Sequence, residues 1–269
     1  MVNIPKITVA TLAEMKRASE KIAMLTCYDY TMSRILDGCG TDVLLVGDSL
    51  GMVVLGYENT IPVTLEEVLH HAKAVRRGCR RGLLVADLPF LSYELDPKEA
   101  ARNAGRLVKE AGVEGVKVEG GLEVASSVKE IVRINVPVMG HLGLTPQSIH
   151  RLGGYRVQGK TPQSAEKILT DAKVLEGSGV FAIVLECIPS GLAEEITRKV
   201  SVPTIGIGAG PHCDGQVLVL DDLLGLYGEH LPKYVKQYAD LKSEVSKAVG
   251  GYLQEVRQGR FPSPEFEYG

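Results

Sequence analysis

Residues 82–120 read GLLVADLPFLSYELDPKEAARNAGRLVKEAGVEGVKVEG and contain two short apolar runs with a helix-like segment between them. The helix has clear boundaries, because Asp96 suits its N-cap, Pro97 its first position and Gly112 its C-terminal end. A strand, a helix and a second strand at this spacing predict two parallel strands joined by a right-handed crossover.

The same alternation recurs along the chain. Thr64 and Glu67 form a capping box that opens another helix. Eight strand-like runs lie at 22–29, 41–49, 82–90, 115–120, 136–144, 181–189, 202–210 and 215–222. This count favours an α/β fold of the closed (β/α)8 TIM barrel type, since open doubly wound sheets usually carry fewer parallel strands. Only residues 211–214 separate the last two runs, so either that crossover lacks a helix or one strand prediction is wrong.

Composition sets the limits on domains and partners. With 269 residues, 45% of them hydrophobic, the chain can bury a large core. We interpret 1–269 as one barrel domain with an N-terminal extension at 1–20 and a C-terminal helix and tail at 233–269 that serve packing or subunit contact. Acidic and basic residues nearly balance, 33 against 30, and no basic stripe occurs, so we expect no nucleic-acid partner.

Localisation and redox chemistry follow from the absence of certain patterns. The N-terminus lacks the apolar core of a signal peptide, and no apolar run approaches the roughly 20 residues that span a bilayer. The five cysteines are scattered without a C-x-x-C pair. We therefore expect a cytoplasmic protein without a membrane partner, a disulfide framework or a structural zinc ion.

Four apolar runs stop on a carboxylate at a corner rich in glycine or proline: Asp48, Asp87, Glu119 and Glu186. In a barrel these strand ends converge on one mouth, where a half-buried charge has to be paired or metal-bound. Asp48 and Asp87 occupy equivalent places in VGDS and VADL, which is typical of oxygen ligands for Mg²⁺. The alternative for each is an N-cap or a salt bridge to a loop.

Four residues at these strand ends have open alternatives. Lys117 and Glu119 share one strand face, so they could simply neutralise each other. Alternatively, Lys117 binds a substrate anion and Glu119 reaches a metal, directly or through water. His141 at a strand end is either structural or part of the site. Glu186 lies in apolar sequence that favours a raised carboxyl pKa and a general acid or base role, with a buried ion pair as the alternative.

Several glycine-rich and proline-containing motifs are less specific. GIGAG at 206–210 lacks the third glycine of a dinucleotide-binding motif and is better explained as a tight turn. GGYRVQGK at 153–160 is either a lid or a solvated loop. TPQS occurs at 145–148 and 161–164, where we interpret it as a generic helix opening.

Taken together, VGDSLGM, ADLPF, VKVEGG, GHLGLTPQS, GGYRVQGK, VLECIP and IGIGAG closely resemble the motifs of the ketopantoate hydroxymethyltransferase family. The resemblance runs from about Lys21 to Pro232. It implies a Mg²⁺-dependent, enolate-forming TIM barrel, usually a homodecamer, that acts in pantothenate synthesis. Such an enzyme transfers a one-carbon unit from 5,10-methylenetetrahydrofolate, its folate co-substrate, to the keto acid 3-methyl-2-oxobutanoate, giving 2-dehydropantoate.

The resemblance also implies roles for individual residues. Asp48, Asp87 and Glu119 correspond to the metal site, and the two aspartates also lie at the substrate. Ser49 and Lys117 correspond to keto-acid contacts. His141 corresponds to a residue that lines the pocket, and Glu186 to the proton acceptor. Two alternatives stay open: a related metal–enolate barrel for phosphoenolpyruvate-like or isocitrate-like substrates, and a non-catalytic barrel with a structural ion.

Overall fold

The computed structural model describes residues 5–227 and 231–269. The chain divides into two compact units, one ending at Val219 and the other spanning Leu220–Gly269. The second unit thus begins earlier than the C-terminal segment predicted from residue 233. Residues 1–4 of the predicted N-terminal extension lie outside the described residues.

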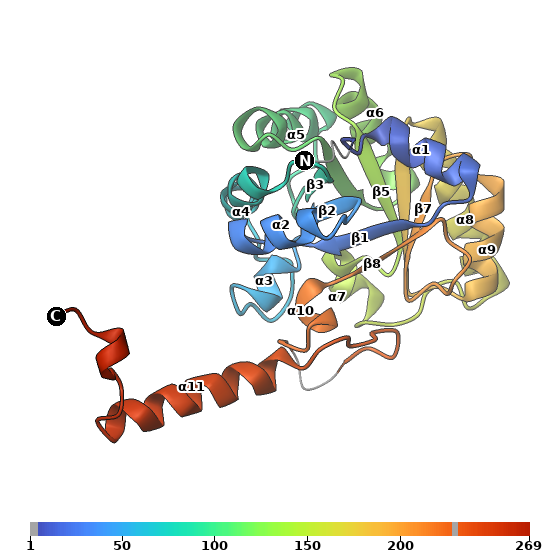
Figure 1. The fold of residues 1–269 in the computed structure, drawn as a ribbon. Helices are drawn as coiled ribbons and strands as arrows, with labels where there is room; N and C mark the ends of the chain where they lie inside the picture. The colour runs from blue at the N-terminus through green and yellow to red at the C-terminus, as the bar shows by residue number, and fades with distance from the viewer. Residues whose placement is uncertain (1–4, 228–230) are drawn as a thin grey trace. The chain divides into compact units, whose positions relative to one another are not determined.

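The first unit is a closed barrel in which every strand is parallel to its neighbours and β8 pairs with β1 (Figure 1). Its strands are β1 Ile22–Thr26, β2 Val43–Val46, β3 Leu83–Asp87, β4 Gly115–Glu119, β5 Val138–Gly143, β6 Ala182–Glu186, β7 Thr204–Ile207 and β8 Gly215–Leu218. Each predicted apolar run contains one of these strands, so the prediction of a (β/α)8 barrel is confirmed. Strands such as β2 and β3 are buried along their whole length because helices cover the outer face and side chains fill the inner one.

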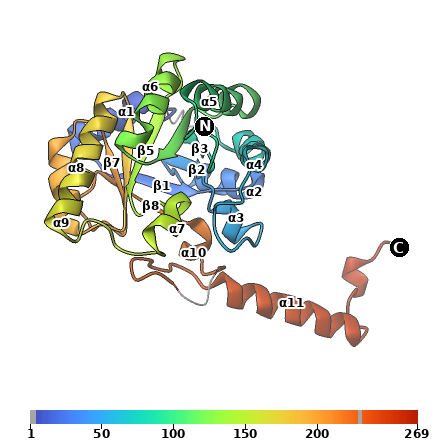
Figure 2. The same ribbon diagram turned by 180° about the vertical axis from the view of Figure 1, so that it is seen from behind.

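Helices surround the strands on the outside of the barrel (Figure 2). In the first unit they are α1 Val9–Ala18, α2 Tyr30–Gly38, α3 Leu50–Val53, α4 Leu65–Gly78, α5 Pro97–Ala111, α6 Ala125–Arg133, α7 Ile149–Leu152, α8 Pro162–Gly177 and α9 Ser190–Lys199. The predicted boundaries of α5 are confirmed: the Asp96 side chain accepts a hydrogen bond from the Lys98 N–H, and Gly112 ends the helix with φ +69°. Thr64 and Glu67 form the predicted capping box of α4.

The N-terminal extension contains α1, whose Leu12 side chain is fully buried. The Lys16 ammonium donates to the carbonyls of Thr197 and Val202 and to Asp214 Oδ2 at 2.8 Å. These partners come from the segments before β7 and β8, so Lys16 fixes α1 at the amino-terminal end of the barrel. This contact joins parts of the chain that are far apart in sequence.

The short crossover between β7 and β8 contains no helix, and both strand predictions are correct. Residues 208–214 return the chain to the start of β8. The Thr204 N–H and hydroxyl both donate to Asp214 Oδ2, at 2.8 and 3.1 Å. The Asp214 carboxylate therefore ties the end of the short crossover to the start of β7, in place of a packed helix.

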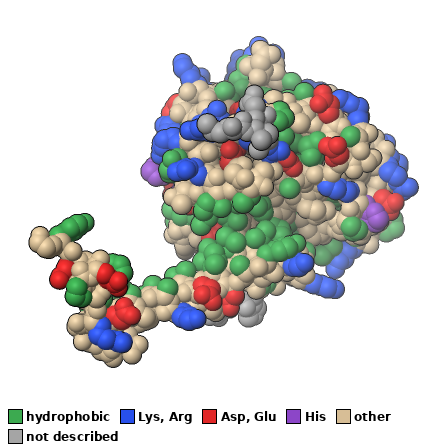
Figure 3. Space-filling model, viewed as in Figure 1, with side chains coloured by type: hydrophobic (Ala, Val, Ile, Leu, Met, Phe, Trp, Pro, Cys, Tyr) green, Lys and Arg blue, Asp and Glu red, His purple; other side chains and the backbone are tan. Residues whose placement is uncertain are grey.

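The second unit contains α10 Leu220–Leu223 and α11 Leu241–Arg257. No residue of α11 is buried within the described chain. The space-filling view shows apolar and charged side chains side by side along this helix (Figure 3). None of the helices in the described ranges is long and apolar enough to cross a membrane.

Candidate active site

The register of the barrel brings the predicted site residues to the carboxyl ends of neighbouring strands. Asp87 pairs with Lys117 across β3 and β4, and Glu119 pairs with His141 across β4 and β5. Glu186 stands opposite Gly143 at the end of β6. These side chains and that of Asp48, which follows β2, are all buried, with exposed fractions of at most 9%. The predicted cluster of strand-end acids is therefore present.

Lys117 and His141 are the cations inside this cluster. The Lys117 Nζ lies 3.2 Å from Asp87 Oδ1 and 3.8 Å from Glu119 Oε1. Burial alone would lower the pKa of Lys117, but the charges of Asp87, Glu119 and Asp48 outweigh burial and raise it. The ammonium form of Lys117 is therefore strongly favoured.

His141 lies between two glutamates. Its Nδ1 is 3.3 Å from Glu119 Oε1, and its Nε2 is 3.2 Å from Glu186 Oε2, although Nε2 is not aligned for a hydrogen bond. Burial and Lys117 lower the pKa of His141, but the two carboxylates outweigh them and raise it to about 9. The 3.2 Å contact between Nδ1 and the Lys117 Nζ is then repulsive, because both ring nitrogens of an imidazolium are donors and Nδ1 cannot accept a hydrogen bond from lysine.

Asp48 and Asp87 form the least compensated part of the cluster. The Asp48 backbone N–H donates to Asp87 Oδ2 at 2.9 Å, which holds the two residues together. Burial raises the pKa of both carboxyls, and repulsion by Asp87 and Glu119 raises that of Asp48 further. Without a metal ion, and despite the neighbouring Lys117, this pair therefore retains a proton more strongly than free aspartate does.

Glu119 differs from the two aspartates. Burial would raise its pKa, but His141, Lys117 and the backbone N–H of Gln147 outweigh burial and lower the pKa below its usual value. Its Oε2 accepts the Gln147 N–H at 2.9 Å, and its buried Oε1 accepts no hydrogen bond. Asp87 Oδ1 is likewise buried without a hydrogen bond. Two oxygens of the cluster thus lack a donor, although each lies near a cation.

The donor set fits Mg²⁺ better than it fits a softer metal. As they stand, the described side chains include no group of three or more His, Cys, Asp or Glu arranged around a metal position. Mg²⁺ needs only one or two protein carboxylates, because substrate oxygens and waters complete its coordination. When all four carboxyls are ionised, one lysine and one imidazolium leave two negative charges, which a divalent cation would balance.

Ser49 and Tyr28 lie beside the acidic cluster. Ser49 precedes α3, and its Oγ is hydrogen-bonded to the Tyr28 hydroxyl at 2.8 Å. Tyr28 was not predicted from the sequence, because the charged residue at the end of the predicted run 22–29 is Asp29, which caps α2, and the neutral side chain of the tyrosine beside it carries no signal of its own. Its place after a strand, like that of Asp48, is the signal that would have identified it.

The backbone around Glu186 is tightly constrained. Gly143 has φ +96°, and a Cβ there would collide with the Glu186 carbonyl oxygen. The Leu144 N–H donates to this same carbonyl at 2.8 Å. Cys187 has φ +47°, in the left-handed region that few residues other than glycine adopt. The Gln158 N–H, from the GGYRVQGK segment, donates to the Cys187 carbonyl at 2.8 Å, so this segment lies against the strand end.

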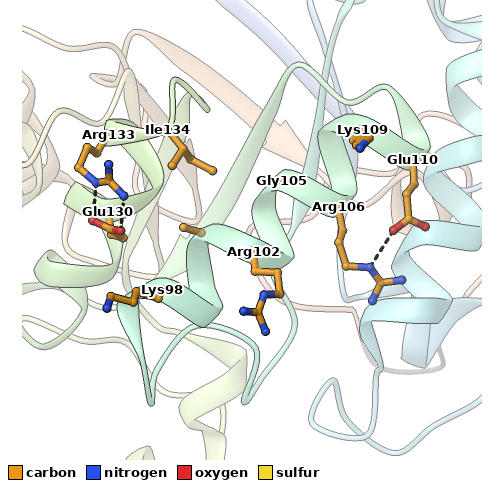
Figure 4. A pocket seen from close by; sticks show the side chains of 10 residues that line it. Lys98, Arg102, Gly105, Arg106, Lys109, Glu110, Glu130, Arg133 and Ile134 are labelled. Atoms are coloured by element: carbon orange, nitrogen blue, oxygen red, sulfur yellow. Dashed lines mark hydrogen bonds and ion pairs between the residues drawn. The ribbon is translucent and has the colours of Figure 1, made fainter.

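A separate groove of about 950 Å³ lies on the outer surface between α5 and α6 (Figure 4). Basic residues line it, but Arg106 pairs with Glu66 and Glu110, and Arg133 pairs with Glu130. Its lining belongs to the outer helices, whereas the acidic cluster belongs to the strand ends. The groove is therefore distinct from the candidate active site.

A closed parallel barrel with buried acids, a lysine and a histidine at the carboxyl ends of its strands belongs to the class of TIM-barrel enzymes. Comparison with known proteins identifies the family within this class. The model of the ketopantoate hydroxymethyltransferase family matches residues 6–264, so the chain belongs to that family.

Two curated relatives are both named 3-methyl-2-oxobutanoate hydroxymethyltransferase. The protein from Geotalea uraniireducens (strain Rf4) is 57% identical over 256 residues, covering 95% of this chain and 96% of the relative. The protein from Carboxydothermus hydrogenoformans is 55% identical over 263 residues, covering 98% of this chain and 95% of the relative. The predicted class of enzyme, a hydroxymethyltransferase, is therefore confirmed.

Solved structures with the same barrel are far more distant in sequence. The 2,3-dimethylmalate lyase of the PEP mutase/isocitrate lyase superfamily has a TM-score of 0.61 at 16% identity, covering 98% of this chain and 93% of its own. The phosphoenolpyruvate phosphomutase from Streptomyces platensis subsp. rosaceus has a TM-score of 0.62 at 12% identity, covering 97% and 92%. At such low identities the likeness supports the barrel fold alone.

Proposed function

We propose that the enzyme transfers a hydroxymethyl group from 5,10-methylenetetrahydrofolate to 3-methyl-2-oxobutanoate and forms 2-dehydropantoate. Carbon C3 of the keto acid bonds to the methylene carbon, and water supplies the hydroxyl group. Both bonds from the methylene carbon to folate nitrogens break, and the two nitrogens take up the C3 proton and the remaining water proton, so that tetrahydrofolate leaves. The names of the close relatives support the substrate and the product. The observation that carries the mechanism is the buried acidic cluster, whose excess negative charge lies next to Glu186.

The metal in this proposal is Mg²⁺, held by Asp48 and Asp87, with Glu119 reaching it directly or through water. When bound, the ion supplies Lewis-acid stabilisation of the negative charge that develops on the keto oxygen, an effect worth several kcal/mol. Because the pair of aspartates otherwise retains a proton, the cation replaces this proton as the source of charge balance.

The remaining residues act on the keto acid and its proton. The Lys117 ammonium offsets the substrate carboxylate, and Ser49 contributes a hydroxyl beside Asp48. Glu186 accepts the C3 proton as general base. His141 holds the Glu186 carboxylate from one side, with 3.2 Å between Nε2 and Oε2, so that the other oxygen is available to the substrate. The left-handed Cys187 and the hydrogen bond to the Glu186 carbonyl fix the backbone that carries this base.

Proton exchange tests the proposal without the folate. The enzyme, Mg²⁺ and 3-methyl-2-oxobutanoate are incubated in D₂O, and loss of the C3–H signal is followed by NMR. We expect rapid exchange by the native enzyme and a loss of about 10²- to 10⁴-fold in Glu186→Gln, the range typical of a lost general base. Glu166→Gln, an exposed site on α8, is the matched control and should exchange normally.

Three results would contradict parts of this scheme. An active enzyme that shows no exchange above background would exclude enolisation before the folate binds. Equal exchange in Glu186→Gln and in the native enzyme would remove Glu186 from the role of base. Activity that persists after treatment with EDTA would exclude the metal.

A further inference from the structure

We propose that Gln147 is a positioning residue that selects which oxygens of Asp48 and Glu119 face the cation. This inference rests on the Mg²⁺ site of the proposed function. Gln147 belongs to the first TPQS segment, in the 3-10 turn Pro146–Ser148, and only 5% of its surface is exposed. Its side chain and backbone together contact both carboxylates.

The Gln147 amide has a complete and directional set of partners. Its Nε2 donates to Asp48 Oδ2 at 2.8 Å and to the Leu88 carbonyl at 3.0 Å. Its Oε1 accepts a hydrogen bond from the Tyr93 hydroxyl at 2.7 Å. Both donors of the amide nitrogen are thus used, and reversing the amide would place its oxygen against two acceptors. The orientation of the side chain is therefore unambiguous.

The backbone of Gln147 acts on the second carboxylate. Its N–H donates to Glu119 Oε2 at 2.9 Å, which leaves Oε1 as the buried oxygen without a hydrogen bond. The side chain engages Oδ2 of Asp48 in the same manner, so Oδ1 is the oxygen left for another ligand. Since one donor is fixed on each acid, neither carboxylate can rotate without losing a hydrogen bond in a buried site.

Tyr93 supports this arrangement from behind. Its side chain is 2% exposed, and its hydroxyl oxygen accepts the Glu119 N–H at 3.1 Å while the hydroxyl faces Gln147 Oε1. Tyr93 therefore links the orientation of the amide to the strand that carries Glu119. Removal of its hydroxyl should loosen the amide without removing the two bonds made by Nε2.

The second TPQS segment provides a matched control within the same chain. Gln163 occupies the same place in its tetrapeptide as Gln147, but it lies exposed in the first turn of α8. The two glutamines therefore share their local sequence and differ in tertiary environment. A substitution that matters only at Gln147 must act through the contacts with Asp48, Leu88 and Tyr93.

The test measures metal binding directly. Mg²⁺ affinity is measured by calorimetry, and bound Mn²⁺ by EPR, in native enzyme, Gln147→Met, Tyr93→Phe and Gln163→Met. We expect Gln147→Met to weaken Mg²⁺ binding by about 10- to 100-fold, the usual effect of losing a partner of a metal-ligating residue. Tyr93→Phe should weaken it several-fold, and Gln163→Met should bind as native. The EPR spectrum of bound Mn²⁺ should broaden in Gln147→Met because its ligands become less ordered.

The double variant and the kinetics complete the test. Gln147→Met with Tyr93→Phe should weaken Mg²⁺ binding by less than the product of the two single effects, because the hydroxyl acts in part through the amide and in part on the Glu119 backbone. Extra Mg²⁺ should restore much of the C3 exchange rate in Gln147→Met, which a general packing defect would not allow. Native Mg²⁺ affinity and a native Mn²⁺ spectrum in folded Gln147→Met would overturn the inference.

If Gln147→Met does not fold, as judged by circular dichroism, Tyr93→Phe decides: native affinity in that variant would overturn the inference. Failure of the proposed function looks different, because the native enzyme itself would then neither bind Mg²⁺ nor catalyse C3 exchange.

Discussion

His141 Nε2 lies 3.2 Å from Glu186 Oε2, so a cation touches the residue proposed to remove the substrate proton. The other ring nitrogen faces Glu119, which we assign to the proposed metal site. One imidazolium thus connects the proposed base with the proposed metal site. Glu119 and Glu186 are therefore linked in space, although we propose different functions for them.

The first prediction concerns the pKa of His141. Glu186→Gln removes one of the two carboxylates that raise this pKa to about 9, so the value should fall. In the metal-free native protein, the stabilisation from His141 is full below the unfolded value of about 6.5 and is lost as the pH rises through about 9. Titration of the His141 ring by NMR checks both statements, and an unchanged pKa in Glu186→Gln would show that the carboxylate has no influence.

The second prediction concerns the pH dependence of metal binding. Burial and mutual repulsion raise the pKa of Asp48 and of Asp87, so protons compete with Mg²⁺ for these carboxyls. Mg²⁺ affinity should therefore keep increasing as the pH rises above the range in which a free aspartate titrates, and binding should release protons. Calorimetry in two buffers of different ionisation enthalpy measures the release. Binding without proton release would mean that the pair is already ionised.

The third prediction is a gain in stability at the expense of function. Asp48→Asn removes one charge of a repelling buried pair and keeps an oxygen that can accept the Gln147 amide. The metal-free variant should be more stable by about 1 kcal/mol, a rise in Tm of roughly 2–4 °C, and should lose its response to Mg²⁺. Thermal unfolding with and without Mg²⁺ provides the measurement.

Asp29→Asn is the control for this prediction. Asp29 is the exposed N-cap of α2, where asparagine caps equally well. Its Tm and its response to Mg²⁺ should match those of the native protein. Destabilisation of metal-free Asp48→Asn would indicate that the Asp48 charge is already fully compensated.

The fourth prediction separates collision from backbone strain. Gly143→Ala places a methyl group against the Glu186 carbonyl, whereas Gly153→Ala has the same kind of left-handed φ with no atom within 4 Å. Gly153→Ala should cost about 1–2 kcal/mol, and Gly143→Ala clearly more, with a reduced kcat because Glu186 moves. Denaturant unfolding and steady-state kinetics distinguish the two variants, and equal effects would exclude the collision.

The fifth prediction concerns Lys16, which stabilises the fold at the amino-terminal end of the barrel, away from the candidate active site. Lys16→Met leaves Asp214 and two carbonyls without their shared donor, so the free energy of unfolding should fall by about 1–3 kcal/mol. The folded variant should have the kcat and KM of the native enzyme. Lys173→Met, an exposed site on α8, should be nearly neutral. A change in KM for Lys16→Met would contradict a purely structural role.

The strand-end acids could be predicted because their position depends on simple geometry. Each follows a run that must be a buried parallel strand, and such strands place their carboxyl ends on one face of a barrel. Asp87, Lys117 and Glu119 therefore come together regardless of the conformation of the loops. The helix boundaries at Asp96 and Thr64 could be predicted for a similar reason, since capping is a local interaction.

Gln147 and Tyr93 could not be predicted, because their roles depend on contacts across the barrel. Tyr93 lies in a loop after β3, and its hydroxyl bonds a glutamine 54 positions further along the chain. The TPQS segment containing Gln147 is identical to one whose glutamine is exposed. Local sequence carries no signal that separates these two environments. Similarly, nothing local indicates that Cys187 adopts a left-handed backbone.

The short crossover from β7 to β8 has a consequence for the order of folding. The barrel closes when β8 pairs with β1, for example Met24 with Val217, which lie near opposite ends of the first unit in sequence. Closing so long a loop carries a large entropic cost, whereas residues 208–214 keep β8 close to β7 at little cost. We therefore expect β7 and β8 to pair before the barrel closes, and ring closure at the β1–β8 seam to limit the folding rate.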